Sequence, residues 1–410
     1  MDRDQLKAFG QAVTDHLTHD LLPYWVERDG WKAKNAFYGW LDEKGLPTQG
    51  EDAPWHSVLY SRLLWTFSAA ARFTGDRGLL AQADRAYAIF RSHFLDHEFG
   101  GAYWLVSPDG SVLDDKKQTY GLAFWVYGLT EYRLAGGPEE ALADAKDIFH
   151  HMQAHLRDPI HGGHVEAANR DWTRASRIGL DEHVPLAEKS MNTHLHVLEA
   201  FTNLLRAYPA DEVRQATAEV LDNFLNHIVD PSGFFHMFLD VDYKPWKGHA
   251  SYGHDIEGSW LLWEAAEVLG DPALLERARP ACLALCDRPR RYGIDPDGGI
   301  IDEGEMDGTP VHTDKGWWQQ AEAVVGQANA YQMTGDEKYL EGAHRTWEFI
   351  DRHIIDHEWG EWFSSVSRDT TQTNRREKVG PWKCPYHNSR MCMEVGRRVK
   401  EILEGKGAHA

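Results

Sequence analysis

Three histidines stand near the starts of segments with helical periodicity, at His196, His254 and His387. The imidazole side chain has an ordinary pKa of about 6.5, so it exchanges protons readily at neutral pH. A single histidine at a helix start is more often a hydrogen-bonded structural residue than a catalyst. Because these three enter successive or nearly successive segments at the same level, the pattern favours general acid–base chemistry.

Each of these histidines shares a helix face with a second polar residue, since residues three or four apart lie on the same side of a helix. We expect Glu257 to orient the imidazole of His254 or to raise its pKa. His194, by contrast, lies about 200° around the helix from His196, so we expect it to pack structurally rather than to bind a metal. The pairs are Asn192 with His196, Glu257 with His254, and Arg390 with His387.

An arginine and several aromatic residues open other segments of the same type. Arg62 lies in an otherwise apolar stretch and needs a partner, which a sugar oxygen or a carboxylate would supply. Tyr120 and Phe124 share a helix face, and Trp317 and Trp318 open a further segment. The chain has 17 Trp, 15 Tyr and 16 Phe, and such rings either fill a large core or stack on the C–H face of a pyranose.

The elements that would position these residues follow a repeat. A turn-forming Asp or Asn and a glycine lead into a short apolar stretch roughly every 60–70 residues, which is typical of a β-hairpin or extended loop. The repeats begin at Asn35, Asp96, Asp158, Asp230, Asp295 and Asp356.

Two kinds of predicted helix alternate between these loops. Several of the apolar helices end in Gly-Asp, a common stop signal. The apolar helices are expected over residues 57–73, 118–134, 192–208, 253–270, 316–335 and 386–403. The more charged ones are expected over 4–22, 79–95, 140–156, 212–228, 273–286 and 338–354.

Six apolar and six polar helices predict an all-α (α/α)6 barrel, with the apolar helices inside, the polar ones outside, and residues 1–410 forming a single domain. A superhelical solenoid would also use helix pairs, but six copies are the number that closes a toroid. The hairpin loops would then gather at one end, above the N-termini of the inner helices. Free N–H groups and the positive end of each helix dipole make that end the expected pocket.

Composition and motifs exclude several function classes. The formal net charge of -21 argues against nucleic acid or an anionic membrane surface as a partner. No apolar stretch approaches the roughly 20 residues of a membrane span, and the N-terminus lacks a secretory signal, so a cytoplasmic location is expected. The four cysteines form no CxxC pair, no HExxH is present, and no metal is expected. Phosphate-binding glycine loops and the GxSxG nucleophile turn are also absent from the sequence.

Four separated motifs resemble those of the cellobiose 2-epimerases in the N-acylglucosamine 2-epimerase superfamily. The resemblance runs over nearly the whole chain and implies an (α/α)6 barrel without a cofactor. The motifs are KSMNTHLHVLEA at 189–200, YGHDIEGSWLLWEA at 252–265, GWWQQAEAVVG at 316–326 and WKCPYHNSR at 382–390.

The resemblance implies epimerisation at C2 of the reducing-end glucose of β-1,4-linked disaccharides. Cellobiose would give glucosyl-mannose and lactose would give epilactose, by ring opening, a cis-enediolate and minor aldose–ketose isomerisation. His254 and His387 match the paired acid/base histidines, and His196 matches the one thought to assist ring opening or to hold the intermediate. The matches to residues lining the sugar site are Arg62, Tyr120, Asn192, Glu257, Trp318 and Trp382.

Two stretches depart from the family pattern, at residues 172–187 and at Ile300–Asp302, where aromatic residues are typical. Both could border the second sugar ring, so they bear on disaccharide preference rather than on the chemistry at C2. The expected partner is a small-molecule sugar, and the expected state is a monomer or a weak homodimer.

Three other functions compete with this one. A mannose 2-epimerase or mannose–fructose isomerase would use the same scaffold with fewer contacts. An inverting glycoside hydrolase would need two carboxylates about 6.5–9.5 Å apart, for which Glu257, Glu303 and Glu322 are candidates. A non-catalytic sugar-binding protein would use the pocket without the proton transfer.

Overall fold

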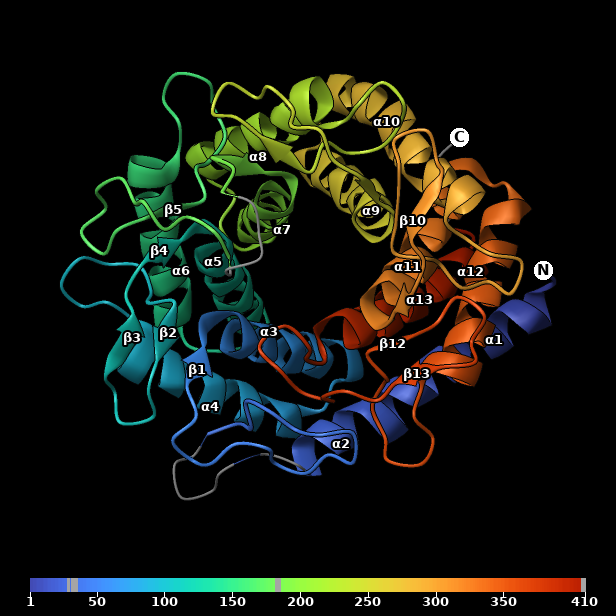
Figure 1. Cartoon of the computed structure of the whole chain (residues 1–410), viewed down its shortest axis with the longest axis horizontal. Coiled ribbons are helices and arrows are strands. Elements are labelled where there is room, and N and C mark those ends of the chain that lie inside the picture. The colour runs from blue at the N-terminus through green and yellow to red at the C-terminus, as the bar shows by residue number, and fades with distance from the viewer. Residues whose placement is uncertain (28–29, 31–35, 181–185, 407–410) are drawn as a thin grey trace.

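Two concentric rings of helices make up most of the chain (Figure 1). The computed structural model describes residues 1–27, 30, 36–180 and 186–406. The inner ring consists of α3 (Ser57–Thr74), α5 (Thr119–Leu134), α7 (Met191–Ala207), α9 (Tyr252–Leu269), α11 (Trp317–Thr334) and α13 (Tyr386–Leu403). The outer ring consists of α1 (Arg3–Asp15), α2 (Leu22–Glu27), α4 (Leu80–Ile89), α6 (Glu139–His151), α8 (Asp211–Asn223), α10 (Pro272–Tyr292) and α12 (Glu337–Phe349).

Most outer helices continue into a short π-helical turn before the chain enters the long loop that leads to the next inner helix. These turns are η1 (His16–Leu21), η4 (Phe90–Phe94), η5 (Met152–Leu156), η6 (Phe224–Ile228) and η7 (Ile350–Ile354), and a 3-10 turn, η3 (Arg77–Leu79), precedes α4.

Burial explains why the two kinds of helix separate into rings. In α5, every residue from Thr119 to Tyr132 is buried, because the helix contacts other helices on all sides. In α4, only Ala83, Ala86 and Ile89 are buried, so one stripe faces the core and the rest faces solvent. The apolar segments of the sequence therefore form the inner ring and the charged segments form the outer ring, as their composition predicted.

The inner ring closes on itself. Each inner helix packs against the next one along the chain, and α13 packs against both α11 and α3. Each also contacts an outer helix, with α1 covering α13 at the seam between the chain's ends. A β-bridge between Leu41 and Val379 joins the first and last loops on the pocket side. The solenoid alternative is wrong, because this closure leaves no open end.

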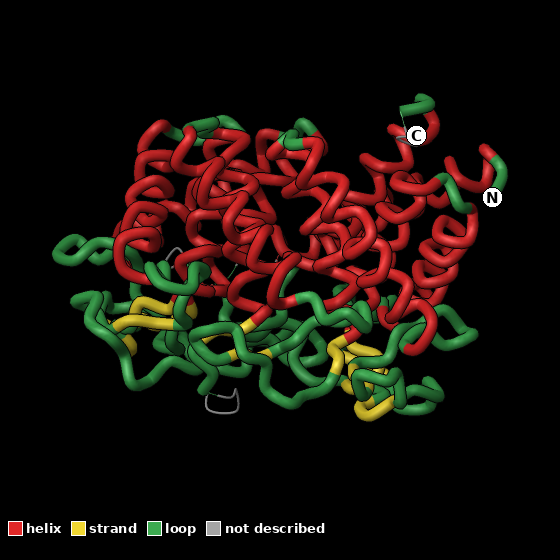
Figure 2. Tube along the Cα trace, turned by 90° about the horizontal axis from the view of Figure 1, so that it is seen from above, coloured by secondary structure: helices red, strands yellow, loops and turns green. Residues whose placement is uncertain are grey.

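The long loops and all described strands lie at one end of the barrel (Figure 2). A two-residue strand precedes most inner helices and pairs with a strand of the following loop, so neighbouring loops are linked around the rim. The ladders are β1 (Trp55–His56) with β2 (Leu105–Val106) and β3 (Val112–Asp114); β4 (Lys117–Gln118) with β5 (Ala167–Ala168); and β6 (Lys189–Ser190) with β7 (Phe238–Leu239). The remaining ladders are β8 (Ala250–Ser251) with β9 (Glu303–Gly304) and β10 (Pro310–His312), and β11 (Lys315–Gly316) with β12 (Ser365–Val366) and β13 (Thr373–Asn374).

A buried ion pair anchors several of these loops. The first residue of β4, β6 and β11 is a lysine whose side chain is 0% exposed. Each lysine pairs with an aspartate at the start of a loop repeat, which compensates the cost of burying the charge. The pairs are Lys117–Asp96 at 2.8 Å, Lys189–Asp158 at 3.0 Å and Lys315–Asp297 at 2.7 Å, with Asp295 at 3.2 Å.

The predicted Gly-Asp stops are confirmed. Gly75 and Gly270 cap α3 and α9 with φ of 76° and 66°, a left-handed conformation that glycine adopts without strain. The aspartate that follows then starts the outer element: Asp271 accepts hydrogen bonds from the amides of Ala273 and Leu274.

The predicted (α/α)6 architecture is confirmed over the described residues, although the first repeat starts at Asn35, which lies outside them. Among the described helices, none combines the length and apolar character that a membrane crossing needs. The four cysteines are buried free thiols: Cys282, Cys286, Cys384 and Cys392.

Candidate active site

A cavity of about 190 Å³ opens at the loop end, where the inner helices begin. All nine residues that were matched to the family's catalytic and sugar-binding residues line it, together with Trp317. They come from all six inner helices and from the segment before α13: Arg62, Tyr120, Asn192, His196, His254, Glu257, Trp317, Trp318, Trp382 and His387.

The repeat explains why residues so far apart in sequence converge. The inner helices start at the same height, so equivalent positions form a layer across the ring. The sixth residues of five inner helices are chemically diverse, and each lines the pocket or contacts a histidine that does: Arg62 on α3, Phe124 on α5, His196 on α7, Glu257 on α9 and Glu322 on α11.

His387 is oriented by a buried carboxylate. Its Nδ1 lies 2.7 Å from Oε1 of Glu322, which also accepts a hydrogen bond from Nη2 of Arg390 at 2.7 Å. A neutral His387 therefore donates its Nδ1–H to Glu322, which leaves Nε2 as the basic nitrogen. Burial lowers the pKa of His387 well below its ordinary value, and the nearby Arg62 guanidinium adds to this effect.

His254 has a different partner. Its Nδ1 lies 2.8 Å from the hydroxyl oxygen of Ser251, the residue before α9. Burial lowers the pKa of His254 to about 3, so its imidazole is neutral and able to accept a proton at neutral pH. The indole of Trp318 contacts both histidines, with ring centroids 4.6 Å from His254 and 5.6 Å from His387.

The expectation that Glu257 orients His254 or raises its pKa is wrong. Glu257 accepts a hydrogen bond from Nη2 of Arg390 at 2.5 Å, and its Oε1 lies 4.0 Å from Nδ1 of His387. The turn of helix between His254 and Glu257 places them on one face but at different depths. The carboxylates that do contact the histidines are Glu322 and, at His196, Glu199.

His196 forms the third corner of the pocket. Its Nδ1 lies 2.9 Å from Oε2 of Glu199, and its ring packs against Tyr120 and Phe124 with centroids 4.9 and 4.6 Å away. Although burial opposes ionisation, Arg390 and His196 lower the pKa of Glu199 to about 2. An ionised Glu199 fixes the orientation of His196.

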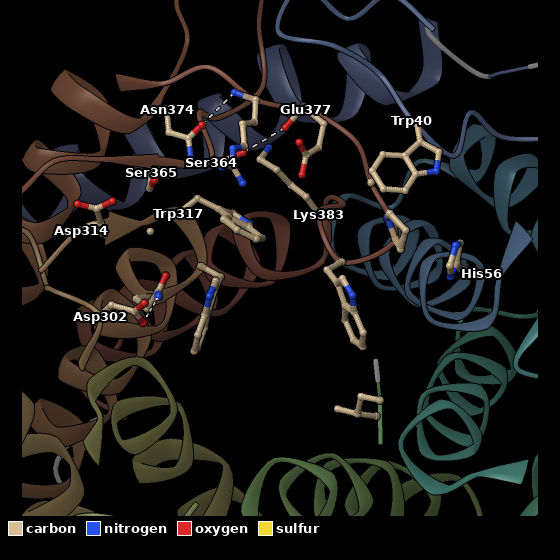
Figure 3. A pocket seen from close by; sticks show the side chains of 18 of the residues that line it. Trp40, His56, Asp302, Asp314, Trp317, Ser364, Ser365, Asn374, Glu377 and Lys383 are labelled. Atoms are coloured by element: carbon tan, nitrogen blue, oxygen red, sulfur yellow. Dashed lines mark hydrogen bonds between the residues drawn. The ribbon is translucent and has the colours of Figure 1, made fainter. Parts of the chain in front are cut away.

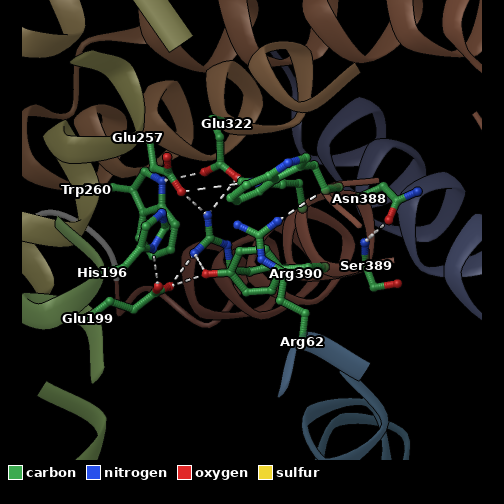
Figure 4. Close-up of polar contacts among 12 residues, drawn as sticks. Arg62, His196, Glu199, Glu257, Trp260, Glu322, Asn388, Ser389 and Arg390 are labelled. Carbon is green, nitrogen blue, oxygen red and sulfur yellow. Dashed lines mark hydrogen bonds and ion pairs between the residues drawn. The ribbon is translucent and has the colours of Figure 1, made fainter. Parts of the chain in front are cut away.

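Arg390 joins three buried carboxylates beneath the pocket (Figure 4). It donates to Glu199, Glu257 and Glu322, and its guanidinium occupies the space between the last two. One cation does not balance three carboxylates, and burial together with Glu322 raises the pKa of Glu257 to about 7. Glu257 is therefore the carboxyl group in the pocket that can hold a proton near neutral pH.

Arg62 has its partner within the protein. Its Nη2 donates to the hydroxyl of Tyr120 at 2.8 Å and its Nη1 to the carbonyl oxygen of Trp382 at 3.3 Å. The guanidinium also lies over the rings of Phe124 and Tyr386, 4.4 and 4.8 Å from their centroids. These contacts fix the position of Arg62 in the wall of the pocket, and its buried Nε has no hydrogen-bond partner within the described part of the chain.

A polar atom of the pocket lacks a protein partner. The side-chain oxygen of Asn192 is buried and accepts no hydrogen bond within the described part of the chain. A buried acceptor without a partner is costly, and a ligand hydroxyl would satisfy it.

A second, larger hollow of about 620 Å³ continues from the pocket toward solvent. It shares Trp317, Trp318 and Trp382 with the inner cavity. Figure 3 shows Trp40 on one side of it and Asp302 on the other.

The two stretches that depart from the family pattern, residues 172–187 and Ile300–Asp302, each contribute a residue to the wall of this hollow. Asp302 and Leu180 line it, whereas Ile300 and Ile301 are buried in the core. Part of the other stretch, residues 181–185, lies outside the described residues.

The carboxylate geometry does not fit an inverting glycoside hydrolase. Glu257 and Glu322 have oxygens within 4.8 Å of each other and share Arg390, whereas such enzymes hold their two carboxylates about 6.5–9.5 Å apart. Glu303 lies on β9 and is not among the residues of either hollow.

His194 has the structural role predicted for it. Its Nδ1 lies 2.7 Å from the carbonyl oxygen of Ser190, and its Nε2 accepts the backbone N–H of His164 at 3.0 Å. Asp255 of α9 and Gln320 of α11 accept loop amides in the same way, so the fourth residue of α7, α9 and α11 connects a loop to its inner helix.

Sequence reasoning missed three members of the site: Glu199, Ser251 and Trp260. The indole of Trp260 donates to Glu322 at 3.1 Å. Glu199 follows His196 by three positions, the same spacing that marked Glu257, and could have been found by that rule.

The fold and the pocket together define a sugar epimerase or isomerase of the (α/α)6-barrel type. Residues 36–390 match the N-acylglucosamine 2-epimerase (GlcNAc 2-epimerase) family. The chain belongs to this family.

Comparison with individual relatives agrees with this family assignment. The chain is 38% identical to a cellobiose 2-epimerase of Bacteroides fragilis over 94% of its own length and 98% of that protein, and 38% identical to one of Ruminococcus albus over 96% and 98%. The solved cellobiose 2-epimerase of Bacillus thermoamylovorans superposes with a TM-score of 0.89 at 35% identity, covering 96% of this chain and 100% of that one. A D-mannose isomerase structure, at 22% identity and a TM-score of 0.81, shows the shared fold.

Proposed function

We propose that the protein epimerises C2 of the reducing-end glucose of β-1,4-linked disaccharides, converting cellobiose to glucosyl-mannose and lactose to epilactose. The observation that carries the proposal is the pair His254 and His387, both buried and of lowered pKa, in one cavity with Trp318 between them. The relatives named above support the disaccharide as substrate.

The reaction begins with opening of the reducing-end ring. His196, held by the ionised Glu199, is the group assigned to this step or to holding the opened sugar. Glu257 can contribute a proton to a sugar oxygen, because its pKa of about 7 keeps much of it protonated at neutral pH. Asn192 offers its unpartnered oxygen to a sugar hydroxyl.

Proton transfer at C2 follows. In the open form the C1 carbonyl makes the C2 proton acidic, since the resulting charge spreads over a cis-enediolate. One histidine removes the proton and the other returns one to the opposite face. Arg62, fixed by Tyr120 and Trp382, is placed to stabilise the developing charge on oxygen. Return of the proton to C1 instead gives a ketose as a minor product.

The outer hollow suits the second sugar ring. It is continuous with the inner cavity through shared tryptophans, and Trp40 and Trp104 add aromatic surface to its wall. Aromatic faces stack on the apolar face of a pyranose, while Asp302 and Lys383 offer polar contacts.

The alternative is a mannose 2-epimerase or mannose–fructose isomerase. The observation that favours it is the small inner cavity of about 190 Å³, which holds every candidate catalytic residue and needs no second ring for the chemistry.

Incubation with cellobiose, lactose, glucose and mannose, followed by chromatographic separation, distinguishes the two. We expect glucosyl-mannose from cellobiose and epilactose from lactose, with no rise in the number of reducing ends. Turnover of the free hexoses alone would contradict the disaccharide proposal. Release of glucose from cellobiose would instead indicate hydrolysis.

A further inference from the structure

A second cluster of histidine and carboxylate side chains lies on the rim of the barrel, outside the sugar pocket. It sits on the three-stranded sheet β10–β9–β8. His249 immediately precedes β8, Glu303 begins β9 and His312 ends β10. None of these three residues lines either hollow.

Their side chains are close enough to share one ion. One ligand atom from each of the three lies within 4.8 Å of the other two. Nδ1 of His249 and Nδ1 of His312 lie 3.6 and 2.6 Å from the same oxygen, Oε2 of Glu303. Metal–ligand bonds of about 2.0–2.2 Å at tetrahedral angles separate neighbouring ligands by about 3.4 Å, which is close to the 3.6 and 2.6 Å that separate Glu303 from the two histidines.

A fourth residue orients one of the histidines. Oε1 of Glu305 lies 3.6 Å from Nε2 of His249, on the opposite side of the ring from Glu303. This separation is too long for a direct hydrogen bond, but a carboxylate beside one ring nitrogen favours the N–H form of that nitrogen by its charge and leaves the lone pair of the other nitrogen free for a metal. Glu305 thus favours the tautomer of His249 whose Nδ1 points at the cluster.

The local sequence departs from the barrel's repeat at this point. β4, β6 and β11 each begin with a buried lysine that pairs with a loop aspartate, but β8 begins with Ala250. The aspartate of that loop, Asp230, pairs with His236 instead, at 3.1 Å. This rim segment therefore lacks the internal cation that anchors its neighbours, and an ion bound across β8, β9 and β10 would restrain it from the outside.

We propose that His249, Glu303 and His312 bind a divalent transition-metal ion of the Zn²⁺ type, with water completing its coordination. Two imidazoles and one carboxylate are a ligand set that suits Zn²⁺ rather than Mg²⁺ or Ca²⁺, which prefer oxygen ligands. The side chains are 40%, 32% and 64% exposed, so the ion has direct access from solvent.

The ion's role is to restrain the loop rather than to take part in catalysis. Glu303 pairs in the ladder with Ser251, whose hydroxyl contacts His254. A bound ion would hold β9 against β8 and so reduce the motion of Ser251. The proposal is independent of the sugar chemistry, because it concerns binding and stability at residues outside the pocket.

Titration of Zn²⁺ alone into full-length, tag-free protein, freed of metal with EDTA and dialysed, tests the site. Competition with a chromophoric chelator gives the affinity, and thermal unfolding gives the stabilisation. We expect saturable binding of Zn²⁺ and a rise in Tm. His249→Ala and His312→Ala should each weaken this binding by more than about 100-fold and abolish the rise, and Glu305→Gln should weaken it by about 10-fold.

His150→Ala is the matched control. His150 forms an exposed pair with Glu212 at 3.1 Å, but among the described residues it belongs to no group of three potential metal ligands. It should bind Zn²⁺ as the wild type does. Zn²⁺ binding unchanged in both His249→Ala and His312→Ala, or no saturable binding by the wild type up to millimolar Zn²⁺, would overturn the proposal. Epimerase assays on the same metal-free samples report the proposed function separately.

Discussion

The two histidines of the pocket occupy similar places but have different surroundings. His254 and His387 both belong to the first turn of an inner helix, on α9 and α13, and both contact Trp318. His387 rests on the carboxylate of Glu322, whereas His254 contacts only a hydroxyl at its Nδ1, that of Ser251. A carboxylate stabilises an imidazolium far more than a hydroxyl does. The two acid/base groups are therefore unequal in their surroundings: Nδ1 of His387 contacts a carboxylate, whereas Nδ1 of His254 contacts a hydroxyl.

The comparison implies first that both histidines are indispensable. His254→Ala and His387→Ala should each lower kcat/KM for cellobiose by about 10⁴-fold, the upper range for a general acid or base. His150→Ala, at an exposed pair far from the pocket residues in sequence, should leave activity unchanged. Steady-state assays of the folded variants measure this, and activity within 10-fold of wild type for either pocket variant would remove that histidine from the mechanism.

Glu322→Gln makes His387 resemble His254, since a neutral amide replaces its carboxyl partner. We expect a loss of about 10²-fold in kcat with a smaller change in KM, because the imidazolium that forms during proton transfer loses its counter-charge. Glu322→Asp should recover part of the loss if charge is what matters. Equal effects on kcat and KM in both variants would point to a general collapse of the site instead.

The pH dependence of kcat/KM reports the lowered pKa values. A base must be neutral to accept a proton, and burial keeps His254 neutral down to a pKa of about 3 and shifts His387 in the same direction. Activity should therefore persist as the pH falls from 8 to about 6 and decline only in more acidic solution, below the ordinary histidine pKa of about 6.5. An acid limb centred at or above pH 6.5 would show that a group of ordinary pKa controls the reaction.

Ser251→Ala tests the weaker partner. Removing the hydroxyl leaves Nδ1 of His254 without this hydrogen bond, and the loss of one neutral hydrogen bond corresponds to about 3- to 10-fold in kcat. Comparing the loss of kcat in this variant with that in Glu322→Gln shows how much each histidine depends on its hydrogen-bond partner. A larger loss in Ser251→Ala than in Glu322→Gln would reverse the asymmetry described above.

The fold could be predicted from the sequence because its information is local. The six-fold repeat, the helical periodicity and stops such as Gly270-Asp271 each lie within one segment. Closed-ring symmetry then placed the starts of all inner helices at one end. For this reason the pocket contains all nine residues that were matched to the family's site, from Arg62 to His387.

The partnerships inside the pocket could not be predicted in the same way. Glu322 reaches His387 from a neighbouring helix, across 65 positions in the sequence, and Arg390 reaches Glu257 across 133. Such contacts depend on how far each helix is rotated about its own axis, which periodicity along a single helix does not fix. Spacing alone therefore assigned Glu257 to His254, its nearest neighbour in sequence, and was wrong.

Solvent deuterium exchange in the single-histidine variants tests the two-histidine mechanism most directly. In ²H₂O, the wild type should introduce deuterium at C2 of both epimers. If each histidine serves one face, His387→Ala should still exchange the C2 proton of one epimer, and His254→Ala that of the other, while neither variant interconverts them. Exchange of both epimers by either variant, or of neither epimer by both, would contradict the assignment of His254 and His387 to opposite faces of C2.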